Sequence, residues 1–238
     1  MLGSFINSLV TAFLVVVFIE VIFSLSPQVN GWLRYQLLFL TGIYRIMLSV
    51  FATFFLTSVN RMTSYIHRGE LDLLLTKPIN SQFLLTFKNI KPFEMLNSLP
   101  GWIIILYSLQ QFPRHEIHTL NILFLIISLI TGLIILYSLY FMLGTLAVWL
   151  KRFSSLNEIY YVIREPLSIP VDFFGRTTSL LLTFIFPLAL IITIPLKISL
   201  NKIPSSFLLI SIVAAAVFLY LSKVFWNFSL KHYTSTGS

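Results

Sequence analysis

The sequence contains no cysteine and few charged residues. Without cysteine, the protein has no disulfides, no thiolate metal sites and no cysteine nucleophile. Asp, Glu, Lys and Arg make up only 10% of the 238 residues, whereas about 25% is typical of a soluble domain. No glycine is followed by lysine, so the Gly-Lys step of the phosphate-binding loop is missing and this chain is not predicted to bind nucleotide phosphates in that way. We therefore predict no catalytic, cofactor-binding or metal-binding residue.

What the sequence does contain is hydrophobic side chains, which make up 57% of it and give a mean hydropathy of +0.91. This composition predicts an all-α, polytopic membrane protein. A separate soluble domain would need roughly 100 to 150 residues, so we expect residues 1–238 to form a single transmembrane domain. The net charge of +8 does not indicate nucleic-acid binding, because the basic residues flank the apolar runs. Membrane proteins carry such an excess of Lys and Arg in their cytoplasmic loops.

Apolar runs predict about six transmembrane helices, since a span needs ~20 residues. Five spans are assigned to residues 5–25, 32–59, 93–112, 120–150 and 206–228. Two regions compete for the remaining one. Residues 180–196 are apolar but interrupted by Pro187 and Pro195, whereas residues 153–169, within the segment 151–170, have an amphipathic pattern. If 153–169 crosses, then 180–196 re-enters the membrane from outside.

Two charged residues, Glu20 and Arg45, lie inside the first two apolar runs. Each would cost ~2.5 to 3.5 kcal/mol near the centre of a span if it were left unpaired. We therefore expect an intramembrane charge pair between them that fixes the register of the hairpin, with movement of the Arg45 head group to the outer surface as the alternative. Gly132 and Gly144 in the long run are interpreted as ordinary packing residues.

The interval from Arg61 to Pro78 is the longest charge-bearing stretch between apolar runs. Its charges alternate with leucines at 71 and 73–75, which predicts an element that offers both kinds of contact to a partner protein. The following residues, 81–90, place Phe83, Phe87 and Ile90 on one helical face, which favours a position along the membrane surface. We call residues 61–92 the coupling segment.

This segment contains an ordered motif: a basic residue, Gly, an acidic residue, Leu and Asp, followed at spaced positions by Leu and Pro. The motif resembles the cytoplasmic segment after the second span in prokaryotic permeases of type-two ATP-binding-cassette (ABC) exporters. The resemblance assigns ATPase coupling to Arg68, Gly69, Glu70, Leu71, Asp72, Leu75 and Pro78. Further similarity comes from Gly31-Trp32, Trp149, Pro187, Pro195 and Tyr233-Thr234-Ser235.

The resemblance implies a six-span permease subunit in the inner membrane that pairs with a second permease, identical or homologous. Separate ABC ATPase subunits would bind ATP and Mg²⁺, so this chain itself is not expected to be an enzyme, and its other contacts would be with membrane lipid. The alternatives are a secondary transporter or channel, and a lipid-modifying membrane enzyme. The first needs more intramembrane ionisable residues than Glu20 and Arg45, and the second needs a cluster of Asp, His or Ser. The string His115-Glu116-Ile117-His118 is one residue too short for a zinc-protease helix and is interpreted as a solvated outer loop.

The distribution of Lys and Arg predicts the orientation, because cytoplasmic loops are enriched in both. Eleven lie on one side, namely Arg61, Arg68, Lys77, Lys88, Lys91, Lys151, Arg152, Arg164, Arg176, Lys223 and Lys231. Four lie on the other, namely Arg34, Arg114, Lys197 and Lys202. Both termini and Thr76 are therefore expected in the cytoplasm, with Asn30 and His115 outside.

Overall fold

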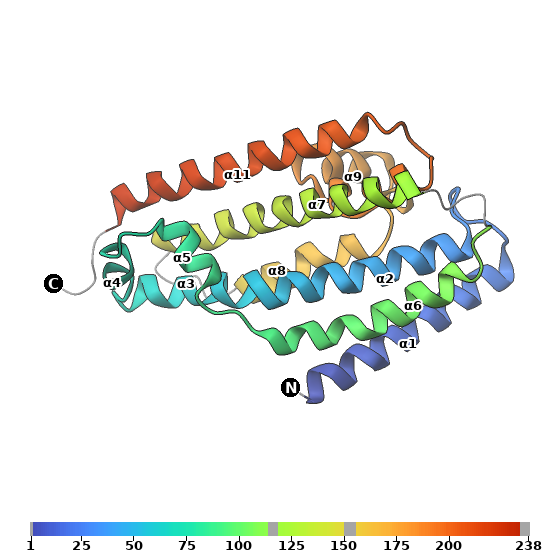
Figure 1. Cartoon of the computed structure of the whole chain (residues 1–238), viewed down its shortest axis with the longest axis horizontal. Helices are drawn as coiled ribbons and strands as arrows, with labels where there is room; N and C mark the ends of the chain where they lie inside the picture. Colours follow the sequence, from blue (N-terminus) through green and yellow to red (C-terminus); the bar gives the residue numbers. More distant parts are fainter. Residues whose placement is uncertain (1, 114–118, 150–155, 234–238) are drawn as a thin grey trace.

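The computed structural model describes residues 2–113, 119–149 and 156–233, which form a bundle of helices (Figure 1). Of these described residues 81% are helical, and none of them lies in a strand. Four helical stretches are long and apolar enough to cross a membrane: Gly3–Leu25, Arg34–Ile66, Thr119–Val148 and Phe207–His232. The predicted all-α polytopic fold is confirmed.

The first two long helices, α1 (Leu2–Leu25) and α2 (Arg34–Phe51), form a hairpin. In the turn between them, Val29 and Trp32 exchange backbone hydrogen bonds of 3.1 and 2.9 Å. Asn30 and Gly31 have φ angles of 47° and 79°, a left-handed conformation that these two residue types adopt at least cost. We call this end of the bundle the turn end.

The second span is longer than a bilayer requires. From α2 the helix continues through a π-helical turn, η1 (Ala52–Leu56), into α3 (Thr57–His67). Its 33 residues rise about 50 Å, roughly 20 Å more than the hydrocarbon thickness. At that far end lie the short helices α4 (Leu71–Leu75) and α5 (Ser81–Phe87), and α11 (Phe207–His232) ends near them (Figure 1). We call it the α4 end.

The chain returns toward the turn end through η2 (Pro92–Ser98), a 3₁₀ segment, and α6 (Leu99–Leu109). Together they rise about 30 Å, enough to cross. The α6 helix packs along α2 at two glycines: a Cβ on Gly42 would lie 2.8 Å from the carbonyl oxygen of Gly101 and 2.5 Å from the Ile105 side chain. Small residues at this crossing let the two backbones approach closely.

The central helix is α7 (Thr119–Thr145), extended by η3 (Leu146–Val148), and it packs in parallel against α11 (Phe207–His232). Its buried hydroxyls donate to carbonyl oxygens of the preceding turn, for example Ser138 to Ile134 at 2.7 Å and Thr145 to Phe141 at 2.8 Å. These hydroxyl groups are therefore accommodated inside the bundle with their donors satisfied.

Residues 156–173 connect the two ends of the bundle. They comprise α8 (Leu156–Arg164), η4 (Glu165–Ser168) and η5 (Val171–Phe173). At the α4 end, Asn60 of α3 donates a hydrogen bond to Asn157. At the turn end, the indole of Trp32 donates to Asp172 at 3.0 Å. This segment therefore crosses the bundle, alongside the second span.

The following stretch enters and leaves the bundle at the same end. It comprises α9 (Arg176–Leu180), a π-helical turn η6 (Leu181–Ile185), η7 (Leu188–Leu190) and α10 (Thr193–Ser199). Its middle reaches Gly132, halfway along α7, and Lys202 then binds the carbonyl of Gly31 back at the turn end. Of the two alternatives for the remaining span, the structure has 156–173 crossing and 180–196 re-entering; residues 151–155 lie outside the described part.

Candidate functional site

The first candidate site is α4, at the end of the bundle that extends beyond the membrane thickness. Gly69 has a φ of 70° and reverses the chain between α3 and α4, a conformation that explains glycine at this position. Beside it, Arg68 and Glu70 lie 3.9 Å apart with side chains 73% and 46% exposed. An ion pair this exposed contributes only ~0 to 1 kcal/mol to stability, so both charges remain available to a partner.

The leucines of α4 divide between the interior and the surface. Leu71 and Leu74 are buried, Leu75 is partly buried, and Leu73 is 72% exposed. The expectation that these leucines all reach a partner is therefore wrong for Leu71 and Leu74, which face the protein core. Leu73, which faces outward, was not among the coupling residues that the resemblance assigned, and helical phase cannot be read from a segment as short as Leu71–Leu75.

On its inner side, α4 approaches the end of α11. Burial, and after it the negative charge of the nearby Asp72 carboxylate, raise the pKa of the Tyr233 phenol. Both effects favour the protonated phenol beside the carboxylate. Asp72 therefore belongs to the inner contact that holds α4 in place, while Lys77 and Pro78 lie exposed beyond it.

The next helix, α5, is fixed by polar contacts. The Asn80 side chain caps it by accepting a hydrogen bond from the Phe83 N–H at 3.0 Å. On its buried face, the Gln82 amide donates to Tyr137 of α7 at 3.2 Å and to Ser222 of α11 at 3.0 Å. The indole of Trp226 on α11 also donates to Ser81 at 2.9 Å. The helix is thus bound to both α7 and α11 by directional contacts.

The opposite face of α5 is apolar and exposed, as its sequence pattern predicts. Phe83, Phe87 and Ile90 are 59%, 38% and 42% exposed, and the two rings lie 4.9 Å apart. The helix ends at Phe87, so Ile90 follows in the connection to η2. The arrangement is unusual for a surface helix, because the polar side faces the protein and the apolar side faces out.

The coupling segment also contacts the second span at its π-helical turn. A π-turn displaces the regular hydrogen-bonding pattern, and such turns are frequent at functional sites. The carbonyl oxygen of Thr53 in η1 accepts a hydrogen bond from the backbone N–H of Lys91 at 2.9 Å. One turn earlier, the Ser49 hydroxyl donates to the carbonyl of Glu94 at 2.6 Å. The end of the coupling segment is therefore attached to the middle of the long helix.

The second candidate site is the exposed face of α8 and η4. Leu156, Tyr160 and Leu167 are buried, and the Tyr160 ring stacks on Phe51 with centroids 5.7 Å apart. The exposed face carries Glu158, Tyr161, Val162, Glu165 and Ile169. Beside it, the Arg164 guanidinium lies 4.4 Å from the Tyr161 ring centroid and 3.4 Å from the Glu165 carboxylate.

These charges lie at membrane depth. The Tyr160 ring, which stacks on Phe51, lies about 26 Å from the turn end, because Phe51 is 17 residues from the start of α2. Arg164 and Glu165 follow about one helical turn nearer the turn end, at a depth of about 20 Å. That depth is inside a hydrocarbon layer ~30 Å thick. The Glu165 side chain is 67% exposed there, so a single subunit presents a charged, uncovered strip at the level of the lipid tails.

A family model described as "ABC-2 family transporter protein" matches residues 9–237, nearly the whole chain. The chain belongs to the ABC-2 transporter family. It is a permease, the membrane component of an ABC transporter, and a multi-pass membrane protein. The resemblance recognised in the coupling segment is confirmed at the level of the family. No curated protein and no solved structure matches this chain.

In this ABC-2 permease the expected Glu20–Arg45 pair is not formed. Glu20 instead pairs with Arg34, whose Nη1 donates to Glu20 Oε2 at 2.8 Å. The reason is depth: Glu20 lies five residues before the end of α1, about 8 Å, whereas Arg45 lies about 16 Å into α2. Arg45 instead reaches the backbone of α1, and its Nη1 donates to the carbonyl of Ser8 at 3.0 Å.

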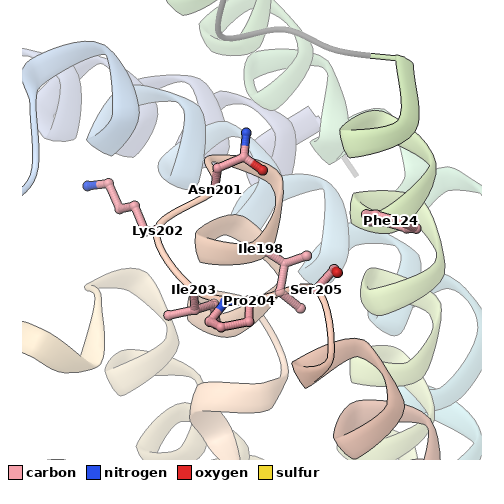
Figure 2. Close-up of a pocket in the computed structure, with 7 residues that line it drawn as sticks. All are labelled: Phe124, Ile198, Asn201, Lys202, Ile203, Pro204 and Ser205. Atoms are coloured by element: carbon pink, nitrogen blue, oxygen red, sulfur yellow. The ribbon is translucent and has the colours of Figure 1, made fainter.

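A cluster that the sequence did not indicate links the re-entrant segment to the hairpin turn. Lys197 of α10 donates to Asp172 Oδ1 at 2.5 Å, and the other carboxylate oxygen accepts from buried Trp32. The Lys202 ammonium lies 4.1 Å from the Trp32 ring centroid. Lys202 belongs to the loop that follows α10, and its side chain points away from Phe124 (Figure 2). This loop borders a pocket of about 400 Å³, which is lined by Phe124, Ile198, Asn201, Lys202, Ile203, Pro204 and Ser205.

Within residues 2–113, 119–149 and 156–233, no three His, Asp or Glu side chains are grouped so that they could hold a metal ion. His115, Glu116 and His118 lie outside the described residues, as do Thr234, Ser235 and Gly237.

Proposed function

We propose that this ABC-2 permease is the membrane-spanning subunit of an ATP-driven exporter and forms half of a translocation path with a second permease, identical or homologous. Residues 1–238 act as a single permease domain in the inner membrane. ATP and Mg²⁺ are bound and used by separate ABC ATPase subunits, which dock at the α4 end. The chain itself transports and does not catalyse.

The observation that supports a path between two permeases is the exposed face of α8 and η4. Charged side chains facing lipid cost ~2.5 to 3.5 kcal/mol each near the middle of a span, so Glu165 and Arg164 favour water or protein at this surface. A second permease placed against the strip encloses it between two subunits. The strip then lines a polar route through the membrane.

The coupling segment provides the mechanical connection to the ATPase. The contacts of α5 with Tyr137 and Ser222, and of Lys91 with Thr53, connect it to α7, α11 and the second span. An ATPase whose two nucleotide states contact α4 differently changes the relative stability of two arrangements of these helices. Arg68, Glu70 and the exposed Leu73 supply the docking contacts, while Asp72 and Leu75 hold α4 against the permease.

We propose that the α4 end lies in the cytoplasm. Arg176 follows Asp172 by four residues and therefore lies at the turn end, so it is counted there. Arg164 lies within the crossing segment and is counted on neither side. The count of Lys and Arg changes from eleven against four to nine against five. The excess of basic residues still favours the same orientation, with both termini inside.

The orientation predicts the accessibility of two introduced cysteines in this cysteine-free chain. Thr76→Cys and Gln28→Cys replace exposed residues at opposite ends; Gln28 is preferred to Asn30, whose positive φ strains other side chains. A membrane-impermeant thiol reagent should label Gln28→Cys on intact cells and Thr76→Cys only after permeabilisation. Labelling of Thr76→Cys on intact cells would reverse the orientation.

The proposed function is tested by photo-crosslinking from the exposed face of α8. Val162→Cys, at a position 71% exposed, carries a thiol-attached photoreactive group in the assembled transporter, and Val217→Cys on α11, 47% exposed, is the matched control. We expect a permease–permease adduct from position 162 and lipid adducts from position 217. Lipid adducts alone from position 162, or protein adducts of equal yield from both, would exclude α8 as the shared surface.

A further inference from the structure

A second cavity lies away from α8, between α2, α6, α7 and the end of α10. Its volume is about 590 Å³ and its lining is almost entirely apolar. The residues that line it are Phe39, Ile43, Ile46, Met47, Val50, Trp102, Ile105, Leu109, Phe112, Asn121, Ile122, Leu125, Ile126, Leu129, Ile130, Leu133, Ser199 and Leu200. We call it the lateral groove. None of these residues is charged.

The lateral groove has the depth of one leaflet. Along α7 it extends from Asn121 to Leu133 and along α2 from Phe39 to Val50, which is about 18 and 17 Å of helix. Half of the hydrocarbon layer is about 15 Å. The groove therefore begins near the turn end and reaches the bilayer midplane.

One polar group at its mouth has no partner. Asn121 is 9% exposed, and its Nδ2 makes no hydrogen bond. The other polar residue lining the groove, Ser199, is satisfied by donating to the carbonyl of Leu196 at 2.8 Å. Leaving a buried donor unpaired is unfavourable, and native structures rarely do so. An occupant that completes the site brings a hydrogen-bond acceptor to Asn121.

The lining favours a hydrocarbon chain over a helix as this occupant. The groove is apolar along about 18 Å, and its unpaired donor, Asn121, lies at the end of that length nearest the turn end. An acyl chain from the leaflet at the turn end enters with its ester carbonyl at that same end. The backbone carbonyls of a helix from a second permease are already bonded within the helix, so they bring no free acceptor to Asn121.

We propose that the lateral groove binds one acyl chain of an ester phospholipid from the leaflet at the turn end. The chain lies along α7 from Ile122 to Leu133, and the ester carbonyl oxygen accepts a hydrogen bond from Asn121 Nδ2. The head group stays outside, because the groove offers it no charged contact. This lipid site is separate from the path along α8 and does not depend on the ATPase.

The test uses the purified transporter, reconstituted with its partners in phosphatidylcholine vesicles containing a trace of phospholipid with a photoreactive acyl chain. Labelled peptides are identified by mass spectrometry. We expect labels on the α2, α6 and α7 residues that line the groove. Asn121→Leu should lower the yield about two- to tenfold, the range expected for one hydrogen bond.

An ether-linked analogue, which lacks the ester carbonyl, should label the native groove as weakly as the ester lipid labels Asn121→Leu, and should not respond to that substitution. Ile126→Trp fills the groove and should abolish the labels, whereas Ile210→Trp, at a similarly exposed position on α11, should not; the two isoleucines are 50% and 52% exposed.

Three results would overturn the lipid site. One is equal labelling of the native protein and Ile126→Trp, and another is an equal effect of Asn121→Leu on ester and ether lipids. The third is efficient disulfide formation between two copies of Ile126→Cys, which would assign the groove to a second permease. Thermal unfolding of each variant is compared with that of the native protein and identifies any variant that is misfolded. If Ile126→Trp is misfolded, Leu129→Trp takes its place, with the same expected result.

Discussion

The variant Leu73→Asp is expected to separate the permease from its ATPase while leaving the permease folded. Leu73 is 72% exposed on α4, between inward-facing neighbours, so the new carboxylate remains in water in the free subunit. In the assembled transporter the same carboxylate is placed in an interface. Loss of a hot-spot contact at the centre of an interface costs about 2 kcal/mol or more, about thirtyfold in affinity.

The neighbouring residues provide the controls. Leu73→Met keeps an apolar side chain of similar volume and should retain the ATPase. Leu74→Asp buries a charge in the core, since Leu74 is only 4% exposed, and should impair folding and insertion. The contrast between adjacent positions separates docking from stability.

The measurement is co-purification of the ATPase with the tagged permease, together with transport-linked ATP hydrolysis in vesicles. We expect Leu73→Asp to lose both while its melting temperature stays within about 2 °C of the native value, as surface substitutions usually do. Full retention of the ATPase by Leu73→Asp would show that α4 is not the docking element.

The second large effect is expected from Gly132→Val. A Cβ at this position would lie 2.5 Å from the carbonyl oxygen and 2.8 Å from the Cα of Ile191. Both atoms belong to the backbone of the re-entrant segment, so no side chain can rotate to make room. Valine must push η7 and α10 away from α7, at a cost of about 1 to 3 kcal/mol or more.

Gly175→Val is the matched control in the same segment, because a Cβ there has nothing within 4 Å. In detergent, Gly132→Val should lower the melting temperature by about 5 to 10 °C, whereas Gly175→Val should change it little. Transport should fall with Gly132→Val even at low temperature, because the Asp172–Lys197 contact depends on where α10 lies. A native melting temperature for Gly132→Val would show that the re-entrant segment is not packed against α7.

The two sites differ in how much of them could be predicted. The α4 segment was located from its ordered motif and from its charges, because a polar interval in so apolar a chain must lie in water. Which of its leucines face outward depends on the contacts of Leu71 and Leu74 with the rest of the bundle. The sequence showed that the α8 region is amphipathic. A helix that crosses the membrane beside a polar path and a helix that lies on the membrane surface have the same amphipathic pattern, so the sequence did not distinguish them.

Long-range polar contacts were the least predictable feature. The expected partner of Glu20 was Arg45, since these are the deepest charges in their runs, yet the hairpin register brings Arg34 to Glu20. Gln82, Tyr137 and Ser222 are separated by 55 and 140 residues along the chain. Neither contact leaves a local pattern in the sequence, because side-chain pairing depends on the relative depth of helices that are distant in the chain.

The sequence by itself determined the membrane class, the long spans, the position of the polar segment 61–92 between two spans, and the family. Each of these follows from local properties, namely hydropathy over ~20 residues, charge in loops and an ordered short motif. Only the tertiary structure decided that 156–173 crosses and 180–196 re-enters, that Leu73 faces out, and that Asn121 lies unpaired at the mouth of an apolar groove. These features depend on which helices pack together and at what depth, which is settled by close contacts such as those at Gly42 and Gly132.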